Sequence, residues 1–203
     1  MVKTRFAPSP SGYLHIGGVR TALYAWLYAR NHGGEFLLRI ENTHIQRSSQ
    51  ESIDSIMEGL KWLGLDHDGE VIYQLDRFDI YQEKANQLIK EGKAYELEGA
   101  IRLKSDRTQN IIIKDQVFGD VEVNKGELDD FIIMRSNGAP TYHLAVVIDD
   151  HESGITHVMR GDDHLKNSAR HIQLMNAFDY PIPQFVHLPM ILGPDGSRLS
   201  TRH

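Results

Sequence analysis

The chain of 203 residues is 40% hydrophobic and 25% charged, the composition of a globular protein with one sizeable core and room for a small additional lobe. Its formal net charge of −6 argues against binding of nucleic acid through a large basic surface. It has no cysteine, which excludes disulfides, thiolate zinc sites and a cysteine nucleophile, and its histidines lack HExxH-type spacing, so we predict no structural metal and no zinc. No apolar run reaches membrane-spanning length and the first residues lack the apolar core of a signal peptide, so we expect a cytoplasmic protein with no role at a membrane.

The stretch from residue 5 to residue 20, RFAPSPSGYLHIGGVR, predicts a nucleotide site. Residues 2–7 have the pattern of a short strand, the two prolines hold the next loop extended, and helical spacing begins at Val19. His15 then lies at a helix N-terminus, where unpaired N–H groups and the helix dipole favour a phosphate. The glycine pair after Ile16 lets a ligand approach the backbone. The alternative is an ordinary strand, loop and helix with a surface histidine.

Residues 35–40, EFLLRI, predict a buried strand that completes a βαβ unit and therefore a parallel sheet. Glu41 follows this strand directly, so we expect its side chain in the crevice that His15 borders, since ligands lie at the carboxyl ends of parallel strands. A solvated charge at a strand end is an equally open interpretation of Glu41.

Two amphipathic helices are predicted next. Ser48 and Glu51 suggest a capping box for the first, which ends at Gly64, and apolar residues at helical spacing from Phe78 predict the second. A short strand at residues 71–73 separates them.

From residue 94 the pattern changes to short β segments, and Asn137-Gly138 predicts a hairpin turn. The expected strands are 100–103, 110–114, 117–123, 131–135, 141–148, 155–159 and 185–192, with one helix at about 163–178. This arrangement predicts an α/β frame that carries an inserted β-rich lobe.

Several ordered motifs resemble those of the class I aminoacyl-tRNA synthetases, and within them the catalytic domain of the glutamyl-tRNA synthetases. They are RFAPSPSGYLHIGG, with HIGG at the family's HIGH element, LLRIENTHIQRS, ELDDFIIMRSNGAPTYHLAVVIDD, ITHVMRGDDH, and HLPMILGPDGSRLSTR, which ends at the KMSKS element. The resemblance implies a Rossmann-like, HIGH-type nucleotidyl transferase fold. Residues 1–95 and 141–203 would form the two halves of the catalytic domain, and residues 96–140 a reduced β-rich insertion. A short relative that glutamylates the queuosine base of a tRNA is a near alternative.

The resemblance implies that ATP and glutamate give glutamyl-adenylate and pyrophosphate, followed by transfer of glutamate to a tRNA 3′ end. Catalysis would be mostly positioning and charge stabilisation on phosphate oxygens, with Mg²⁺ accompanying ATP. The implied catalytic residues are His15, Arg198, Ser200 and Arg202. The implied ATP-binding residues are Pro8, His15, Gly17, Gly18, Asp163, Leu192 and Arg198. The implied glutamate-binding residues are Arg5, Ala7, Ser9, Glu41, Tyr142 and Arg160. Arg5 or Arg160 suits the side-chain carboxylate of glutamate, and Glu41 suits its ammonium group. The alternatives are that Arg5 and Arg160 form surface ion pairs and that Tyr142 is a core aromatic.

The chain also departs from the family pattern. Thr201 replaces the second lysine of KMSKS, a loss of about 3 kcal/mol or on the order of a hundredfold in rate unless Arg198 or Arg202 substitutes. Asn42 and His44 stand where aspartates are usual. After Tyr95 the acceptor-stem-binding insertion is missing, and the chain ends at the KMSKS-like loop.

These departures leave several hypotheses open. We expect glutamate and ATP as substrates, depleted recognition of tRNA, and a monomer. The alternatives are a non-catalytic binding domain that keeps the pockets, a paralogue that passes glutamate to another acceptor, and a generic nucleotidyltransferase of the same HIGH type.

Overall fold

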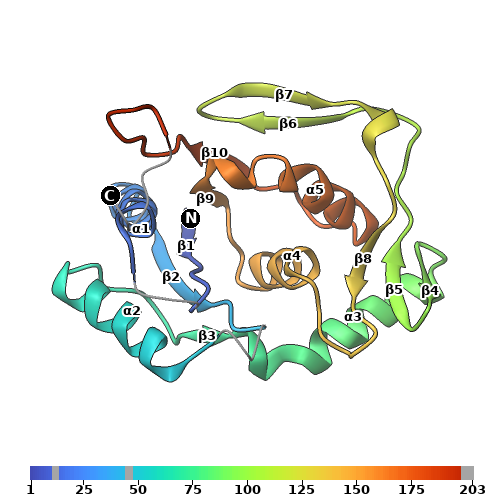
Figure 1. Ribbon diagram of the computed structural model, residues 1–203, viewed down its shortest axis with the longest axis horizontal. Coiled ribbons are helices and arrows are strands. Elements are labelled where there is room, and N and C mark those ends of the chain that lie inside the picture. Colours follow the sequence, from blue (N-terminus) through green and yellow to red (C-terminus); the bar gives the residue numbers. More distant parts are fainter. Residues whose placement is uncertain (11–13, 44–47, 198–203) are drawn as a thin grey trace.

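The computed structural model describes residues 1–10, 14–43 and 48–197 (Figure 1). Within these residues the α-helices are α1 (Ile16–Asn31), α2 (Gln50–Trp62), α3 (Phe78–Lys90), α4 (Tyr142–Glu152) and α5 (Asn167–Ala177). The strands are β1 (Lys3–Phe6), β2 (Glu35–Ile40), β3 (Ile72–Tyr73), β4 (Ala94–Leu97), β5 (Ala100–Leu103), β6 (Ile111–Asp115), β7 (Gly119–Val123), β8 (Phe131–Met134), β9 (His157–Gly161) and β10 (Gln184–Leu188). The short 3₁₀ helices are η2 (Gln74–Arg77), η3 (Lys125–Glu127) and η4 (Asp162–His164). None of the helices in these ranges is long and apolar enough to cross a bilayer.

A central layer of mostly parallel strands runs through the molecule. Strands β1, β2 and β3 pair in parallel, and β9, β10 and β6 pair in parallel in a second ladder. Strand β1 lies beside β9, where the Thr156 N–H donates to the Lys3 carbonyl at 3.0 Å, so the order across the layer is β3-β2-β1-β9-β10-β6-β7. Among these strands β7, which returns from β6 as a hairpin, is antiparallel. The structure confirms the predicted α/β class and its parallel sheet.

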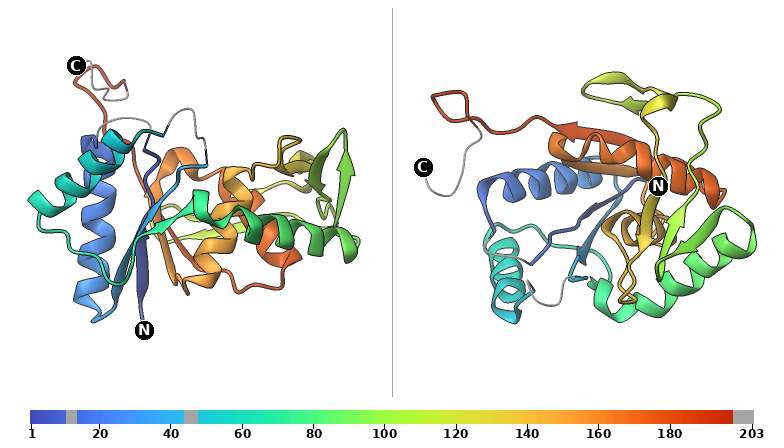
Figure 2. Two further views of the ribbon diagram at one scale, coloured as in Figure 1. Left: turned by 90° about the horizontal axis from the view of Figure 1, so that it is seen from below. Right: turned by 45° about the vertical axis from the view of Figure 1, so that its right-hand side comes forward.

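Helices cover both faces of this layer (Figure 2). Helices α1 and α2 pack in a core cluster on one face, and α4 and α5 pack in a second cluster on the other. Because side chains alternate along a strand, neighbouring residues face opposite helices. The Thr4 hydroxyl donates to a carbonyl of α1 at 2.7 Å, whereas Arg5 is bonded to α4. The same alternation directs three further strand residues to the α4 and α5 face, namely Arg39, Arg160 and His187.

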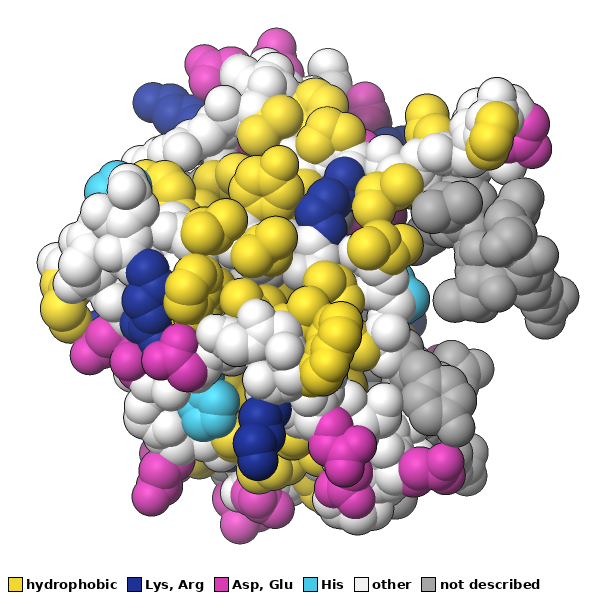
Figure 3. Space-filling view, turned by 90° about the vertical axis from the view of Figure 1, so that its left-hand side faces the viewer, with side chains coloured by type: hydrophobic (Ala, Val, Ile, Leu, Met, Phe, Trp, Pro, Cys, Tyr) yellow, Lys and Arg dark blue, Asp and Glu magenta, His cyan; other side chains and the backbone are white. Residues whose placement is uncertain are grey.

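Helix α1 contacts the sheet through small side chains. Ala22, Ala25 and Ala29 are fully buried, which allows the helix axis to approach the strands closely. The larger side chains face outward, and Tyr24 is 52% and Leu27 48% exposed. Figure 3 shows hydrophobic side chains gathered on this side of the molecule, and Tyr24 and Leu27 also line a cavity of about 420 Å³ against β10. The apolar surface of α1 therefore lies on the other side of the sheet from the buried arginines.

Residues 141–148, which the sequence predicts as a strand, form the start of α4, so that prediction is wrong. All side chains from residue 144 to residue 150 are buried. A segment that is buried on every side has no polar face, so its pattern does not distinguish a helix from a strand. The predicted turn at Asn137-Gly138 is present, with Gly138 at φ +80°, but it is followed by a single bridge between Met134 and Pro140 and then by the helix.

Some predicted boundaries also differ. Helix α1 begins at Ile16 rather than Val19, and α2 is capped by Ser49, whose side chain accepts from the Ser52 N–H at 3.1 Å, rather than by Ser48. The helix predicted at 163–178 is divided into η4 and α5. Capping contacts decide where a helix ends, and spacing in the sequence defines its buried face better than its ends.

The β-rich segment at residues 96–140 divides between two sheets. Strands β4, β5 and β8 form an antiparallel sheet at the end of the molecule away from α1 and α2 (Figure 1), and β4 begins at Ala94. Strands β6 and β7 instead extend the central layer, because β6 pairs with β10 at Asp115 and Phe185. This part of the segment is therefore continuous with the sheet that carries Arg160.

The turn between β4 and β5 consists of Glu98 and Gly99, with φ angles of 53° and 76°. Two successive positive φ values define a type I′ hairpin turn, which favours Asn-Gly, and a Cβ in this region costs about 1 kcal/mol. We expect Glu98→Asn to stabilise the chain by roughly 0.5–1 kcal/mol, seen as a higher midpoint in urea unfolding. Glu96→Asn, at an exposed position of the extended strand β4, is the matched control. An equal rise in both variants would contradict the assignment to the turn.

Candidate functional site

The loops that follow β1 and β2 meet at one edge of the central layer. The Glu41 N–H, one residue beyond β2, donates to the Pro8 carbonyl at 3.0 Å. Ala7, Pro8 and Ser9 lie in the loop after β1, with Ser9 exposed and the other two half-buried. The structure thus brings Glu41 together with the loop that leads toward His15.

His15 caps the N-terminus of α1. Its Nδ1 atom accepts from the Gly18 N–H at 3.4 Å, and the ring is exposed. The first turn of α1 has no acidic residue, so the positive pole of the helix dipole is not compensated there. A Cβ on Gly17 would lie 3.2 Å from the His15 ring, and one on Gly18 would lie 3.3 Å from Leu14 Cδ1, so glycine keeps this helix start compact. The groups present suit a phosphate.

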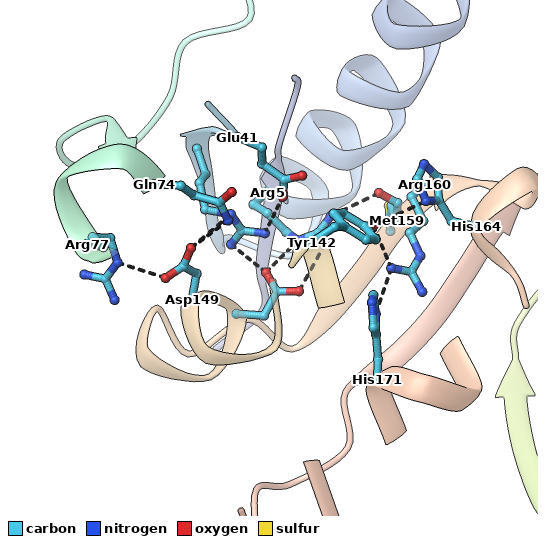
Figure 4. A network of polar contacts seen from close by, with 12 residues as sticks. Arg5, Glu41, Gln74, Arg77, Tyr142, Asp149, Met159, Arg160, His164 and His171 are labelled. Carbon is cyan, nitrogen blue, oxygen red and sulfur yellow. Dashed lines mark hydrogen bonds and ion pairs between the residues drawn. The ribbon is translucent and has the colours of Figure 1, made fainter. Parts of the chain in front are cut away.

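A buried ionic network lies on the α4 face of the sheet (Figure 4). Asp150 of α4 accepts from Arg5 Nε at 2.9 Å and Nη2 at 3.1 Å, and from Arg39 Nη1 at 2.7 Å. Arg39 Nη2 in turn donates to Glu41 at 3.1 Å. Burial opposes ionisation of Asp150, but the charges of Arg39 and Arg5 outweigh it and lower its pKa to about 2. Burial raises the pKa of Glu41, against the charges of the same two arginines.

Asp149, the neighbour of Asp150, extends this network toward the surface. It accepts from Gln74 at 2.9 Å, from the Tyr81 hydroxyl at 2.8 Å and from Arg77 Nε at 2.8 Å, and its side chain is fully buried. Sequence reasoning missed Arg39, Asp149 and Asp150. The available signal was an arginine in the apolar strand EFLLRI, because a charge on a buried strand needs a partner.

Arg160 on β9 differs from the other buried arginines. Its Nε donates to His187 Nε2 at 3.1 Å, Nη2 to the Ser168 hydroxyl at 2.7 Å, and Nη1 to the Tyr142 hydroxyl at 3.3 Å and to His171 Nδ1 at 3.1 Å. Within the described parts of the chain no carboxylate is within ion-pair distance of it, although only 5% of the residue is exposed. Burial lowers the pKa of Arg160.

Arg5 and Arg160, the two candidates for binding a substrate carboxylate, therefore differ in whether their charge is already paired. Two guanidinium nitrogens of Arg5 are occupied by Asp150, and Nη1 contacts the Met159 carbonyl at 3.4 Å. Among the residues that the structure describes, the acceptors of Arg160 are all neutral, so none of them cancels its charge by direct contact. A buried cation without an anionic partner favours a carboxylate ligand, and the Tyr142 hydroxyl lies next to it.

Two of the remaining predicted site residues are exposed, namely Asp163 in η4 and Leu192 beyond β10. Asn42 is buried and its side-chain oxygen accepts from the Leu75 N–H at 2.9 Å, which joins the end of β2 to η2. His44, Arg198, Ser200, Thr201 and Arg202 lie outside the described residues.

A parallel α/β layer flanked by helices, with a helix N-terminus and buried arginines near the ends of its strands, defines a Rossmann-like domain. The family described as tRNA synthetases class I (E and Q), catalytic domain, matches residues 1–100 and 96–203. The chain belongs to this family, which confirms the predicted resemblance.

Similar proteins include the glutamate–tRNA ligases of Legionella pneumophila (strain Corby) and Rhodopseudomonas palustris, each 47% identical over the whole chain and over 51% of their own length. A crystal structure of a glutamate tRNA ligase from Elizabethkingia meningosepticum, in complex with its amino acid, superposes with a TM-score of 0.90 at 36% identity, over 99% of this chain and 52% of that one. The chain thus spans about half the length of these relatives.

The alignment with the Legionella relative is longer than this chain. The match to the Legionella protein extends over 239 residues, 36 more than the 203 of this chain. The two segments matched by the family meet at residues 96–100, which include the tight turn between β4 and β5.

Proposed function

We propose that this chain activates glutamate with ATP to form glutamyl-adenylate, for transfer to a tRNA. The observation that carries the proposal is Arg160, a buried guanidinium held only by neutral side chains within the described residues. Its position next to Tyr142 suits the side-chain carboxylate of glutamate, and a neutral amide such as that of glutamine would leave its charge unbalanced.

We assign the ammonium group of glutamate to another part of the same sheet face, at the end of β2. Glu41, at the end of β2, offers a carboxylate for the ammonium group, with Arg39 holding its Oε1 atom at 3.1 Å. Arg5 lies between the two ends, fixed by Asp150, and the Ala7–Ser9 loop borders the site. Glutamate would then be oriented with its α-carboxylate toward the α1 end of the loop.

The nucleotide would lie at the N-terminus of α1. His15, Gly17, Gly18 and Pro8 form this region, and we assign Asp163, Leu192, Arg198, Ser200 and Arg202 to the same substrate by family match. The α-carboxylate of glutamate attacks the α-phosphorus of ATP, a C–O–P bond forms, and the bond to the β-phosphate breaks with release of pyrophosphate. Mg²⁺ bound to ATP would neutralise phosphate charge; within the described residues no group of three or more potential ligands is placed to hold a metal by itself.

A tRNA is the acceptor we propose, as in the named ligase relatives. With a net charge of −6, contacts to tRNA from clustered Arg and Lys would act against an unfavourable overall field, so we expect weak and salt-sensitive binding. We further propose that the chain acts as a monomer in the cytoplasm.

The test is glutamate-dependent exchange of pyrophosphate into ATP, measured with and without tRNA. We expect exchange with glutamate and little with glutamine. Measurable ATP binding without exchange under either condition would contradict the proposed function and favour a non-catalytic binding domain. Exchange that proceeds equally well with glutamine would contradict the role of Arg160.

The nucleotide assignment gives a separate prediction. His15→Ala removes a side chain at the helix end proposed for phosphate, so we expect the KM for ATP to rise by about tenfold, the value of one lost hydrogen bond to a charged group, with little change in the KM for glutamate. His67→Ala, at a half-buried histidine in the loop after α2, is the matched control. If the KM for glutamate rose instead, the nucleotide would not lie at this helix end.

A further inference from the structure

We propose that Asp115 positions Arg160 for the substrate carboxylate by fixing the tautomer of His187. This inference rests on the proposed function, because Arg160 is the residue to which that function assigns the carboxylate. Neither Asp115 nor His187 belongs to the residues assigned to the site by family match. They come from the β6 strand of the insertion and from β10.

His187 bridges Asp115 and Arg160. Its Nδ1 atom lies 2.5 Å from Asp115 Oδ2, and its Nε2 atom accepts from Arg160 Nε at 3.1 Å. The His187 side chain is fully buried, as is that of Asp115. The three residues form a line from the insertion, through the central sheet, to the candidate site.

The donors and acceptors allow one tautomer. The Arg160 guanidinium can only donate, and an ionised Asp115 can only accept. His187 satisfies both only when its proton is on Nδ1 and the Nε2 lone pair faces Arg160. Burial, followed by the charge of Arg160, lowers the pKa of His187 to about 4, which keeps the ring neutral near pH 7.

Asp115 is itself held firmly. Its Oδ1 atom accepts from the Val117 N–H at 2.9 Å and the Phe118 N–H at 3.0 Å, and its Oδ2 atom accepts from the His187 N–H at 3.1 Å. All of these contacts require an acceptor. An asparagine in place of Asp115 would direct an NH₂ group at one set of these donors and disturb the arrangement.

A second histidine, His171, also accepts a hydrogen bond from Arg160, at the Nη1 atom. His171 Nδ1 accepts from Arg160 Nη1 at 3.1 Å, so its proton is on Nε2, which lies 3.2 Å from His143 Nδ1. Burial and the charge of Arg160 lower the pKa of His171 well below its usual range. Neutral acceptors thus orient the guanidinium without cancelling its charge, and the Asp115 carboxylate orients it from one residue further away. A carboxylate in direct contact with Arg160 would compete with the substrate.

The decisive readout is the protonation of His187, and the exchange of the Arg160 Nε–H, in the full chain labelled with ¹⁵N-histidine and ¹⁵N-arginine. In the parent we expect the long-range ¹H–¹⁵N spectrum to show His187 with its proton on Nδ1, and the Arg160 Nε–H signal to exchange slowly with solvent. In Asp115→Asn we expect the Nδ1–H pattern to be lost and the Arg160 Nε–H signal to exchange faster. A parent ring protonated on Nε2, or an unchanged ring in Asp115→Asn, would overturn the proposal. These signals do not depend on activity, so they separate the inference from the proposed function.

Steady-state exchange kinetics supply the second readout. We expect Asp115→Asn to raise the KM for glutamate on the order of tenfold while the KM for ATP stays within about twofold. Val121→Ala is the matched control, because Val121 lies on β7 of the same hairpin and packs it against the hydrophobic core. If Val121→Ala raised the KM for glutamate equally, Asp115 would act only by docking the hairpin.

A double-mutant cycle tests whether Asp115 acts through the ring. In a His187→Gln background, whose side-chain amide can still present an oxygen to Arg160, Asp115→Asn should raise the KM for glutamate by less than twofold further. Full additivity of the two substitutions would overturn the proposed route through His187.

Discussion

Arg160→Gln is expected to raise the KM for glutamate on the order of 100-fold, equivalent to about 3 kcal/mol, while the KM for ATP changes little. The reason is that Arg160 alone among the buried arginines of the described residues has no carboxylate partner, so its charge remains for the substrate. The measurement is glutamate-dependent pyrophosphate exchange over a range of glutamate concentrations.

The same substitution should not destabilise the fold. Removing a buried charge that has no ion partner in the described part of the chain relieves a desolvation cost, so we expect the thermal midpoint of Arg160→Gln to equal or exceed that of the parent. The preference for glutamate over glutamine should fall in the variant. Arg107→Gln, at an arginine whose side chain is 55% exposed, controls for loss of a positive charge and should leave both KM values unchanged. If Arg160→Gln kept the parental KM for glutamate, Arg160 would not be the residue that binds the substrate carboxylate.

Asp150→Asn, in contrast to Arg160→Gln, should strongly destabilise the fold. This substitution leaves Arg5 and Arg39 without their shared carboxylate in the protein interior. Breaking a buried ion pair on one side costs about 3–5 kcal/mol, which for a chain of this length lowers the thermal midpoint by roughly 10 °C. Asp120→Asn, at an exposed position of β7, is the control and should change the midpoint little.

The pH dependence of stability gives an independent check on Asp150. Its pKa in the folded chain is lowered to about 2, below its value in the unfolded chain, so its contribution is present above about pH 4 and is lost as the pH falls toward 2. Urea unfolding at a series of pH values should therefore show the parent and Asp150→Asn converging across this window. Parallel curves from pH 6 to pH 2 would mean that Asp150 does not stabilise the fold through its charge.

Much of the fold follows from local patterns. The strand, glycine-ended loop and helix at the N-terminus, the buried strand EFLLRI and the amphipathic helices α2 and α3 were predictable, because each has a clear period or a distinct terminal residue. Helix α4 was not predictable in this way, since a segment buried on all sides has no polar face to show its period.

The candidate site was predictable in part. The motifs place Arg5, Glu41, Tyr142 and Arg160 near one another, but they do not say which arginine is already paired. That depends on Asp150, which lies 145 residues from Arg5 in the sequence. Likewise the support of Arg160 by His187 depends on Asp115, which is 72 residues from His187.

The sequence by itself determined the family, the parallel α/β class and the types of side chain available at the site, because these depend on local spacing and ordered motifs. Only the tertiary structure decided which charges cancel and which remain. Strand alternation places Arg5, Arg39 and Arg160 on one face, and the helix that crosses that face brings carboxylates to Arg5 and Arg39 but not to Arg160. The free energy of a buried charge depends on its neighbours in space, and those neighbours come from distant parts of the chain.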